Sequence, residues 1–474
     1  MTDRYSSPFS QRYSSDKMQY LFSDDNRYKT WRLFWISLAK AQRKLGINIT
    51  QEQIDEMIEN KDNIDYEMVK QFEKKLRHDV MSHIKAYGVT CPKASLIIHL
   101  GATSCFVTDN TDIVIMRDAI TLIRKKLVAV IKNLADFAMK YKDTPTLGYT
   151  HFQPAQLVTV GKRACLWIQD FFMDFEQLQF TYDSLMLRGV KGTTGTQASF
   201  MSLFENNEEK VDTLEKLVCA DFGFEKSFPI TGQTYTRKLD TRVLQSLSSI
   251  AQSAHKMCTD IRLLQGLKEI EEPFEKSQVG SSAMAYKRNP MRSERVCSLA
   301  RYIITNAHNP EITASVQWLE RTLDDSANRR LSISEGFLAT DGMLDILLNI
   351  SDNLVVNESI IYKHIMEEIP FIATENILME SVKRGGDRQK LHEKIREYSM
   401  EASNRIKNEG LNNNLLSLIS NDPDFNITPD ILERLTEPSQ YTGRATTQTQ
   451  IFLTSLSSLF DKYFSSDIEV ELIV

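Results

Sequence analysis

The sequence predicts an all-α protein, and three observations support this fold class. Its 474 residues include only 18 glycines and 12 prolines, roughly half the usual share of these helix-breaking residues. Long segments carry apolar residues at alternating spacings of three and four, which line one face of a helix. Alternation of apolar and polar residues, which is typical of strands, nowhere reaches a comparable length.

The amino-terminal part, residues 1–103, is expected to be a small helical domain. Its first twenty residues are polar and lack the apolar segment of a secretory signal, so we expect a loose arm there. A loop is expected at residues 87–109, which contain two glycines and a proline. Between the arm and the loop, helical spacing predicts three helices, at residues 28–45, 51–60 and 66–85. Gly46 is a suitable end for the first of them.

A central bundle of long helices is predicted at residues 104–356. From Asp112 to Lys140, apolar residues lie at spacings of three and four along one helix face. A second stripe runs from Arg237 to Glu272 without proline, and as one helix it would span about 54 Å. Because a compact domain is narrower than this, the length favours a bundle that associates with other subunits.

A third, smaller helical domain is predicted at residues 357–474. Shorter helical segments alternate there with breaks at Gly385–Gly386, Asn412–Asn414 and Asn421–Pro423. Residues 468–474 fit either a short strand or a packed tail, and the pattern does not decide between them.

Composition and charge exclude several classes of function. The net charge of −6 gives no basic field for nucleic acid, so an anionic ligand needs a local cluster of cations. No apolar run is long enough to cross a membrane. The six cysteines lie at least 14 residues apart and form no zinc-binding pattern. We therefore expect reduced, buried thiols in a cytoplasmic protein without a metal or cofactor.

The strongest candidate for chemistry is the segment Gly280–Arg295, in the connection after the second long stripe. Residues 287–295 hold four cations and one anion inside a net-negative protein. A solvated basic loop would explain this charge alone. The preceding glycine and two serines add a mobile backbone and hydroxyls, which suit a lid over an anionic substrate. The hydroxyl of Ser281 is a useful base only beside cations that stabilise its alkoxide, and Lys287 and Arg295 are available.

His151 is a second candidate, within the run Thr146–Gln156. A lone histidine is more often structural than catalytic. This one lies in a predicted turn between Thr150 and Gln153, where polar partners are expected to fix its tautomer.

The run Arg77–Asp79 combines charges and is followed, after Gly101, by Thr103 and Ser104. One interpretation of the run is a charge cluster at a helix end. The other is an anion site, which the hydroxyl residues after Gly101 favour, since short side chains beside a glycine let backbone N–H groups approach an anion. A metal site at His78 and His83 is excluded, since five residues on a helix rotate by about 500° and turn the rings apart.

The segment Gln317–Arg330 is read either as surface ion pairs or as a phosphate site. Ser326 and Arg330 are four residues apart and share a helix face. Arg321 and Arg330 would point in opposite directions on one straight helix. If both bind one phosphate, the helix must therefore begin near Asp324–Ser326, which is a natural capping sequence.

Together these motifs resemble those of a known enzyme family. The pattern Gly-Ser-Ser-x-Met-x-x-Lys-x-Asn-Pro at residues 280–290 resembles the signature loop of the fumarase/aspartase superfamily. Its continuation to Arg295 is similar to that of the adenylosuccinate lyases in particular. One departure is Ala285, where the family usually has proline. Alanine leaves the backbone freer, so we expect an effect on rate and lid closure rather than on the reaction.

The resemblance implies the three-domain fumarase/aspartase-like fold and a homotetramer whose active sites are shared between subunits. It implies β-elimination of fumarate from adenylosuccinate, giving AMP, and from SAICAR, giving AICAR, without metal or cofactor. Ser281 would be the base and His151 the acid. The remaining family positions imply substrate contacts at Arg12, Tyr13, Arg77, His78, Asp79, Thr103, Ser104, Gln233, Lys287, Asn289, Arg295, Arg321, Ser326 and Arg330.

Three alternatives are set against this hypothesis. Another superfamily lyase, of the argininosuccinate lyase or fumarase type, would not need the phosphate-binding set Arg321, Ser326 and Arg330. A non-catalytic, crystallin-like relative would not need both Ser281 and His151. A helical scaffold would leave the loop at 280–295 without a purpose. The glycine-rich run 189–195 lacks the spacing of a phosphate loop and is expected to be a turn between helices.

Overall fold

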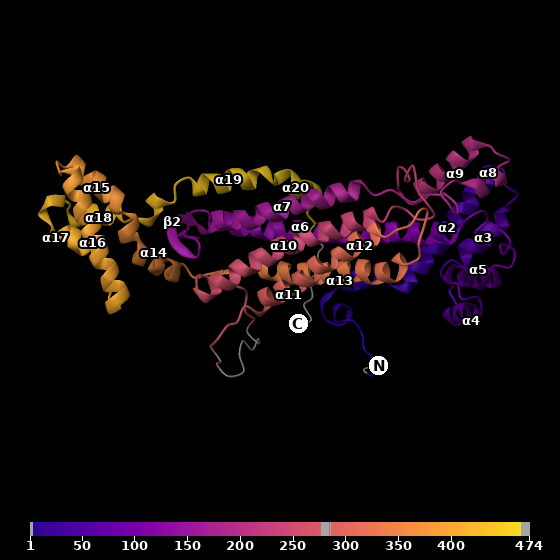
Figure 1. Ribbon diagram of the computed structural model, residues 1–474, viewed down its shortest axis with the longest axis horizontal. Helices are drawn as coiled ribbons and strands as arrows, with labels where there is room; N and C mark the ends of the chain where they lie inside the picture. Colours follow the sequence, from indigo (N-terminus) through magenta and orange to yellow (C-terminus); the bar gives the residue numbers. More distant parts are fainter. Residues whose placement is uncertain (1–2, 276–283, 285, 466–474) are drawn as a thin grey trace.

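The computed structural model describes residues 3–275, 284 and 286–465, and it confirms the all-α class. Figure 1 shows an elongated molecule, in which long helices form a central bundle between a smaller group of helices at each end. In the described part of the chain, strands form only two antiparallel pairs.

The amino-terminal arm is more ordered than its polar sequence predicts. It contains a short π-helical turn η1 (Phe9–Tyr13) and α1 (Asp16–Leu21), whose Met18 is fully buried. The side chain of Ser15 caps α1 by accepting a hydrogen bond from the backbone N–H of Met18. The helices that follow at this end of the molecule are α2 (Asp24–Lys44), α3 (Gln51–Glu59), α4 (Tyr66–Leu76) and α5 (Asp79–Thr90), with α8 (Ala198–Leu203) and α9 (Glu208–Asp221) beside them.

Two predictions for this region are wrong. The helix expected at 66–85 is two helices, because Arg77 adopts a left-handed conformation (φ +51°) that ends α4, and His78 then caps α5. The expected loop at 87–109 is shorter, because α5 continues to Thr90 and the next helix begins at Ser104.

The central bundle is built from long helices, as predicted. The helix α6 (Ser104–Lys140) carries the first apolar stripe, and the second stripe is buried along α10 (Lys238–Gly266). However, α10 is 29 residues long rather than 36. Lys268 has a positive φ, and the N–H of Glu269 donates back to the carbonyl of Leu264, which closes the helix end. The other helices of the bundle are α7 (Val160–Asp183), α11 (Met291–Asn306), α12 (His308–Ser315) and α13 (Asp325–Asp352).

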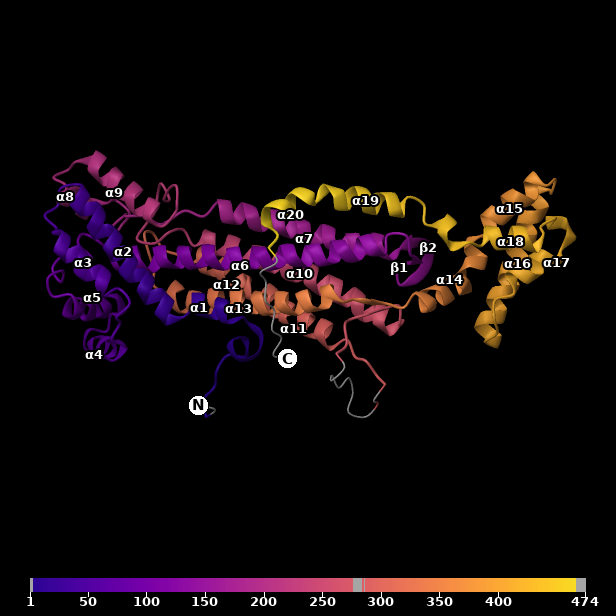
Figure 2. The same ribbon diagram turned by 180° about the vertical axis from the view of Figure 1, so that it is seen from behind.

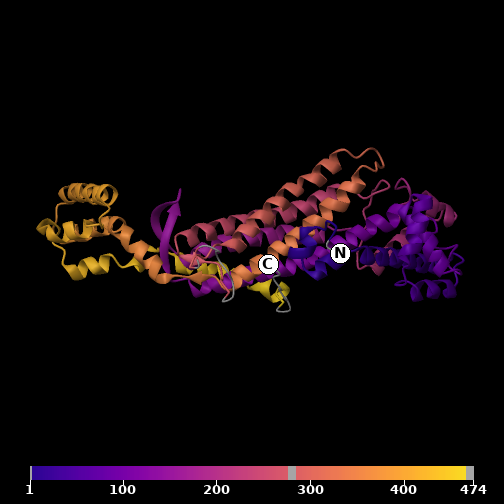
Figure 3. The same ribbon diagram turned by 90° about the horizontal axis from the view of Figure 1, so that it is seen from below.

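A β-hairpin joins α6 to α7. Its strands are β1 (Pro145–Thr150) and β2 (Gln153–Thr159), and Thr150 pairs with Gln153. His151 and Phe152 form the two-residue turn, with φ of +54° and +59°, the left-handed pair that matches strand twist. This confirms the turn predicted at His151. The hairpin lies at the end of the bundle near α14 (Figure 2) and projects away from it (Figure 3).

The carboxy-terminal part has its own hydrophobic core, formed by residues between Ala373 and Leu435. The last helices α19 (Ala445–Ser455) and α20 (Ser457–Tyr463) return to the bundle, where the ring of Tyr463 lies 5.0 Å from that of Phe175. The division at residues 103 and 356 remains a proposal. The other elements here are β3 (Ile270–Glu271), β4 (Val355–Val356), α14 (Glu358–Ile372), α15 (Thr374–Lys383), α16 (Arg388–Glu409), α17 (Leu415–Asn421), η2 (Pro423–Phe425), α18 (Pro429–Leu435) and η3 (Pro438–Tyr441).

All six cysteines are buried and unpaired, as predicted. Among the described residues, no helix is both long and apolar enough to span a bilayer.

Candidate functional site

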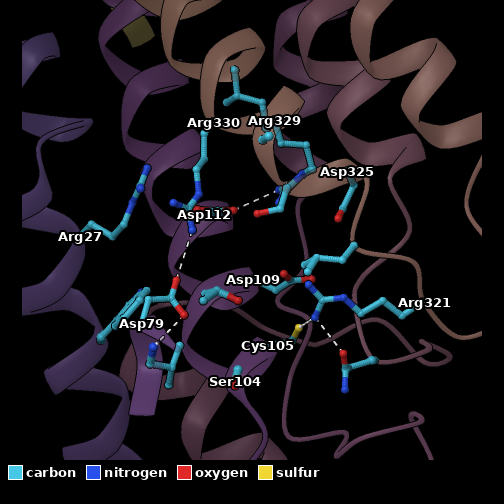
Figure 4. Close-up of a pocket in the computed structure, with 18 of the residues that line it drawn as sticks. Arg27, Asp79, Ser104, Cys105, Asp109, Asp112, Arg321, Asp325, Arg329 and Arg330 are labelled. Atoms are coloured by element: carbon cyan, nitrogen blue, oxygen red, sulfur yellow. Dashed lines mark hydrogen bonds and ion pairs between the residues drawn. The ribbon is translucent and has the colours of Figure 1, made fainter. Parts of the chain in front are cut away.

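A pocket of about 1100 Å³ lies where α5, α6 and α13 begin (Figure 4). Nine of the predicted site residues line it, although they come from four separate parts of the sequence. They are Arg77, His78, Asp79, Thr103, Ser104, Gln233, Arg321, Ser326 and Arg330.

Three helix amino-termini meet at this pocket. His78 caps α5, Thr103 precedes α6 and Asp324 precedes α13. The first N–H groups of a helix have no partner within the helix, and the helix dipole places partial positive charge there. The pocket therefore suits an anion such as a phosphate.

Arg321 lies on one side of the pocket, in the irregular segment before α13. Its Nη1 donates to Oε1 of Gln233 at 2.8 Å and contacts the sulfur of Cys105 at 2.6 Å. Both partners are uncharged at neutral pH, because burial raises the pKa of Cys105 to about 11. The positive charge of Arg321 is therefore available to a ligand. The break that separates Arg321 from Arg330 occurs where it was predicted, although Asp324 makes no side-chain cap.

Gln233 is fixed by close backbone packing and by a buried arginine. A Cβ at Gly232 would lie 2.4 Å from the carbonyl oxygen of Glu320, so only glycine fits there. Arg188, which is fully buried, donates to the carbonyl oxygens of Gln233, Gly189 and Gly192 at 2.9, 3.2 and 2.5 Å. Arg188 thus joins the glycine-rich run 189–195, which is a turn between α7 and α8 as predicted, to the pocket wall.

Arg330 and Asp79 lie on the other side, where Nη2 of Arg330 donates to Asp79 at 3.2 Å (Figure 4). His78 accepts a hydrogen bond at Nδ1 from the N–H of Met81 at 3.4 Å, so in the neutral ring the proton lies on Nε2. That Nε2 faces the hydroxyl of Ser104 at 3.4 Å.

His83, unlike His78, is not among the residues that line the pocket, so the two rings do not face one site, as predicted. Its ring packs on those of Tyr28 and Trp31, at centroid distances of 3.9 and 5.2 Å. Burial, followed by the nearby charge of Arg32, lowers the pKa of His83 to about 4.

A buried ion-pair network forms the floor of the pocket, and sequence reasoning missed it. Arg237 donates to Asp109 at 3.1 and 3.3 Å and to Asp325 at 2.8 Å. Oδ2 of Asp109 also accepts a hydrogen bond from the backbone N–H of Tyr235, at 2.9 Å. Burial alone would raise the pKa of Asp109, but the surrounding guanidinium groups, Arg237 first, lower it below its usual value.

Arg329 completes the network. It donates to Asp240 at 2.7 Å, to Asp112 at 3.0 Å and to the hydroxyl of Tyr235 at 2.5 Å. Ion pairs neutralise Arg237 and Arg329, so these two residues shape the pocket. Arg27, Arg77 and Arg321 also line the pocket but form no ion pair with another described residue. They therefore carry the positive charge that is available to a ligand.

The other predicted residues lie elsewhere in the chain. The ring of His151 is exposed at the hairpin turn and makes no hydrogen bond with any residue the structure describes, so the tautomer-fixing partners expected nearby are not observed. Arg12 and Tyr13 lie in η1, and Tyr13 packs against Gly342 of α13. Lys287 and Asn289 precede α11, and Arg295 lies within it. Ser281, Ala285 and residues 468–474 lie outside the described residues.

Within one chain, the hairpin and the pocket lie far apart. Ser104 begins α6 and the hairpin follows its end, so the 37 residues of this helix put about 55 Å between them. One substrate cannot contact both places on the same chain.

Comparisons with known proteins agree with these features. A family model described as lyase matches residues 2–305, and one described as adenylosuccinate lyase C-terminus matches residues 370–452. Adenylosuccinate lyases of Saccharomyces cerevisiae and Schizosaccharomyces pombe are 53% and 52% identical to the chain, each over 95% of it and 94% of the relative. The enzyme of that name from Schistosoma mansoni is 45% identical over the same shares.

Solved structures are similar in fold. A fumarate lyase from Mesorhizobium has a TM-score of 0.78 and 21% identity, over 95% of this chain and 99% of that one. The 3-carboxy-cis,cis-muconate lactonizing enzyme of Pseudomonas putida has a TM-score of 0.80 and 20% identity, over 94% and 98%. At this identity the likeness concerns the fold alone.

Proposed function

Because the chain belongs to the adenylosuccinate lyase family, we propose that the pocket at the start of α5, α6 and α13 binds the nucleotide part of that family's substrates. The reaction is β-elimination of fumarate from adenylosuccinate, giving AMP, and from SAICAR, giving AICAR, in purine nucleotide biosynthesis. It makes the protein a carbon–nitrogen lyase.

One observation carries the pocket assignment: available arginine charge meets three helix amino-termini. A nucleotide phosphate is a compact dianion that accepts several hydrogen bonds, and guanidinium groups match its geometry. Arg321 and Arg330 face the pocket from opposite sides, with Ser326 between them in sequence. Thr103 and Ser104, which follow Gly101 and line the pocket, would bind a carboxylate of the succinyl group.

The chemistry needs a base and an acid. Ser281 removes a proton from the carbon next to a carboxylate, and the electron pair moves into that carboxylate. Lys287 and Asn289 stabilise the resulting dianion. The electron pair then returns from the carboxylate to form the carbon–carbon double bond of fumarate as the carbon–nitrogen bond breaks. The pair of that bond goes to the departing nitrogen, which His151 protonates. Exchange with solvent afterwards removes the proton from Ser281 and returns one to His151.

We infer that the enzyme is a homotetramer with active sites shared between subunits. The separation of about 55 Å between the hairpin and the pocket supports this, since residues with one joint task must then come from different chains. An exposed apolar stripe on α7 also supports association, because its members lie seven residues apart on one helix face, at Leu166, Met173 and Phe180. We place the enzyme in the cytoplasm, which its six unpaired thiols support.

The function is tested by mixing the purified protein with adenylosuccinate and following the ultraviolet change, with fumarate identified by mass. SAICAR is tested in the same way. Ser281→Ala and His151→Ala should each lower kcat by at least about 10²-fold without loss of folding. Wild-type turnover in either variant would remove that residue from its role, and a folded oligomer that turns over neither substrate would contradict the activity.

A further inference from the structure

Glu269 is a buried carboxylate that the proposed mechanism does not use. It follows the end of α10 and is fully buried. Its backbone is fixed on both sides, because its N–H donates to the carbonyl of Leu264 and its own carbonyl accepts from the N–H of Asn357, each at 2.9 Å. A carboxylate in such a position is costly unless it has partners.

The partners of this carboxylate belong to the hairpin and to the helices beside it. Oε1 accepts a hydrogen bond from the hydroxyl of Tyr149 at 3.0 Å and lies 2.8 Å from Nδ1 of His364 on α14. Oε2 lies 3.9 Å from Nη1 of Arg163 on α7. Burial, followed by the charge of Glu269, raises the pKa of Tyr149, so its hydroxyl keeps the proton that it donates.

These contacts extend to the turn that carries His151. Arg163 donates through Nη2 to the carbonyl oxygen of Leu147 on β1. The ring of Tyr149 lies 5.7 Å from that of Phe152, the residue next to His151. Tyr149 lies on β1, two residues before His151 in the turn. The hairpin that carries His151 is therefore held to the bundle by groups that converge on Glu269.

We infer that Glu269 is a positioning residue for the reaction, which orients the hairpin so that His151 reaches the departing nitrogen of a substrate bound mainly by other chains. The inference rests on the proposed role of His151 and goes beyond it. It assigns Glu269 to the same functional unit as His151, although the two are 118 residues apart in sequence.

Glu272 offers a matched control three residues further along. It is also a buried carboxylate, but it accepts hydrogen bonds from the N–H groups of Arg292 and Ser293, at 3.0 and 2.8 Å, at the start of α11. It therefore contacts the segment that follows the 280–290 loop and makes no hydrogen bond to the hairpin. Both glutamates are buried carboxylates, but Glu269 contacts the hairpin and Glu272 contacts the start of α11.

The first measurement is steady-state kinetics with Glu269→Gln, which keeps the size of the side chain but replaces one acceptor oxygen by an NH2 group facing Tyr149 or Arg163. Because a misplaced acid slows the chemical step more than binding, kcat should fall at least about tenfold while KM stays within about twofold. Tyr149→Phe, which removes one hydroxyl, should shift kcat in the same direction by less, and it carries the test if the first variant does not assemble.

The second measurement mixes inactive variants and verifies subunit exchange by native mass spectrometry. E269Q mixed with S281A should regain activity, since an intact hairpin and an intact serine then meet in some sites. E269Q mixed with H151A should regain none, because no chain has an intact hairpin. The control variant E272Q keeps an intact hairpin, so activity should return when it is mixed with H151A.

Unchanged kcat in E269Q and Y149F, or recovery when E269Q is mixed with H151A, would overturn the inference. Failure of the proposed role of His151 is distinguished by a separate measurement, the kcat of the single variant H151A. A wild-type kcat in that variant would remove His151 from catalysis, and the positioning role of Glu269 with it.

Discussion

Gly342 of α13 is the point at which the amino-terminal arm meets the bundle, and replacing it by alanine should weaken substrate binding. An added Cβ would lie 2.7 Å from the carbonyl carbon, the oxygen and the Cβ of Tyr13. Ordinary contact needs about 3.5 Å, so the arm must move by about 0.8 Å. The family resemblance implies substrate contacts at Arg12 and Tyr13, and we propose that these contacts are to the substrate phosphate. Both residues would move with the arm.

The arm, rather than the bundle, should absorb the strain. The segment η1, which meets Gly342, contains no buried residue, and the arm is joined to α13 by hydrogen bonds such as those from the N–H of Ser15 to Asp341 at 2.7 Å and from the hydroxyl of Ser7 to Glu335 at 3.1 Å. Overpacking costs about 1–3 kcal/mol, whereas alanine in a helix interior stabilises by about 1 kcal/mol relative to glycine. The melting temperature should therefore change by only a few degrees.

Displaced phosphate contacts should raise KM for adenylosuccinate about tenfold, equivalent to about 1.4 kcal/mol, with kcat largely retained. The assay is the initial rate of ultraviolet change over a range of substrate concentrations. Gly336→Ala is the matched control on the same helix, because its Cβ would meet the side-chain nitrogen of Asn306 at 3.1 Å and nothing of the arm. An unchanged KM in Gly342→Ala, or an equal rise in the control, would refute this reasoning.

Two further predictions concern the pocket and the amino-terminal helices. Arg321→Met should raise KM about ten- to hundredfold, since a charged hydrogen bond to phosphate contributes about 1.5–3 kcal/mol; a KM equal to that of the wild type would exclude Arg321 from binding. His83→Phe should reduce acid sensitivity. Burial, then the charge of Arg32, lowers the pKa of His83 from 6.5 to about 4, so the unfolded chain binds a proton there that the folded chain does not. Wild-type stability is therefore lost as pH falls from 6.5 to 4, and the variant should lose about 3 kcal/mol less in urea unfolding over that window. Parallel losses in the two proteins would contradict the assignment.

The long helices were predictable because one physical pattern, the apolar stripe, extends over many turns. The stripes from Asp112 and from Arg237 both lie buried in the bundle. Their ends were less predictable. Arg77 ends α4 in a left-handed conformation without the glycine that usually indicates it, and Lys268 does the same after α10. A few residues in unfavourable conformations, stabilised by tertiary contacts, leave no local signal.

The candidate site divides in a similar way. Eight of the nine pocket residues were candidates because they lie in short runs of charged and hydroxyl residues, and Gln233 was implied by the family resemblance. The network beneath them was not predicted, because Arg237 pairs with Asp109 and Asp325, which are 128 and 88 residues away in sequence. The residues next to Arg237, Asp109 and Asp325 in the sequence give no indication of these ion pairs. The separation of His151 from the pocket was also invisible, since it depends on the length and direction of α6.

We propose that each catalytic centre combines residues of different chains. The decisive measurement is to mix His151→Ala with Ser281→Ala in equal amounts, verify subunit exchange and measure the conversion of adenylosuccinate. If the acid and the base of each site come from different chains, about a quarter of wild-type activity should return, because the two contributions are drawn independently from the mixture. Activity that stays at the level of the separate variants after full exchange would show that each chain supplies both groups, and would contradict the account.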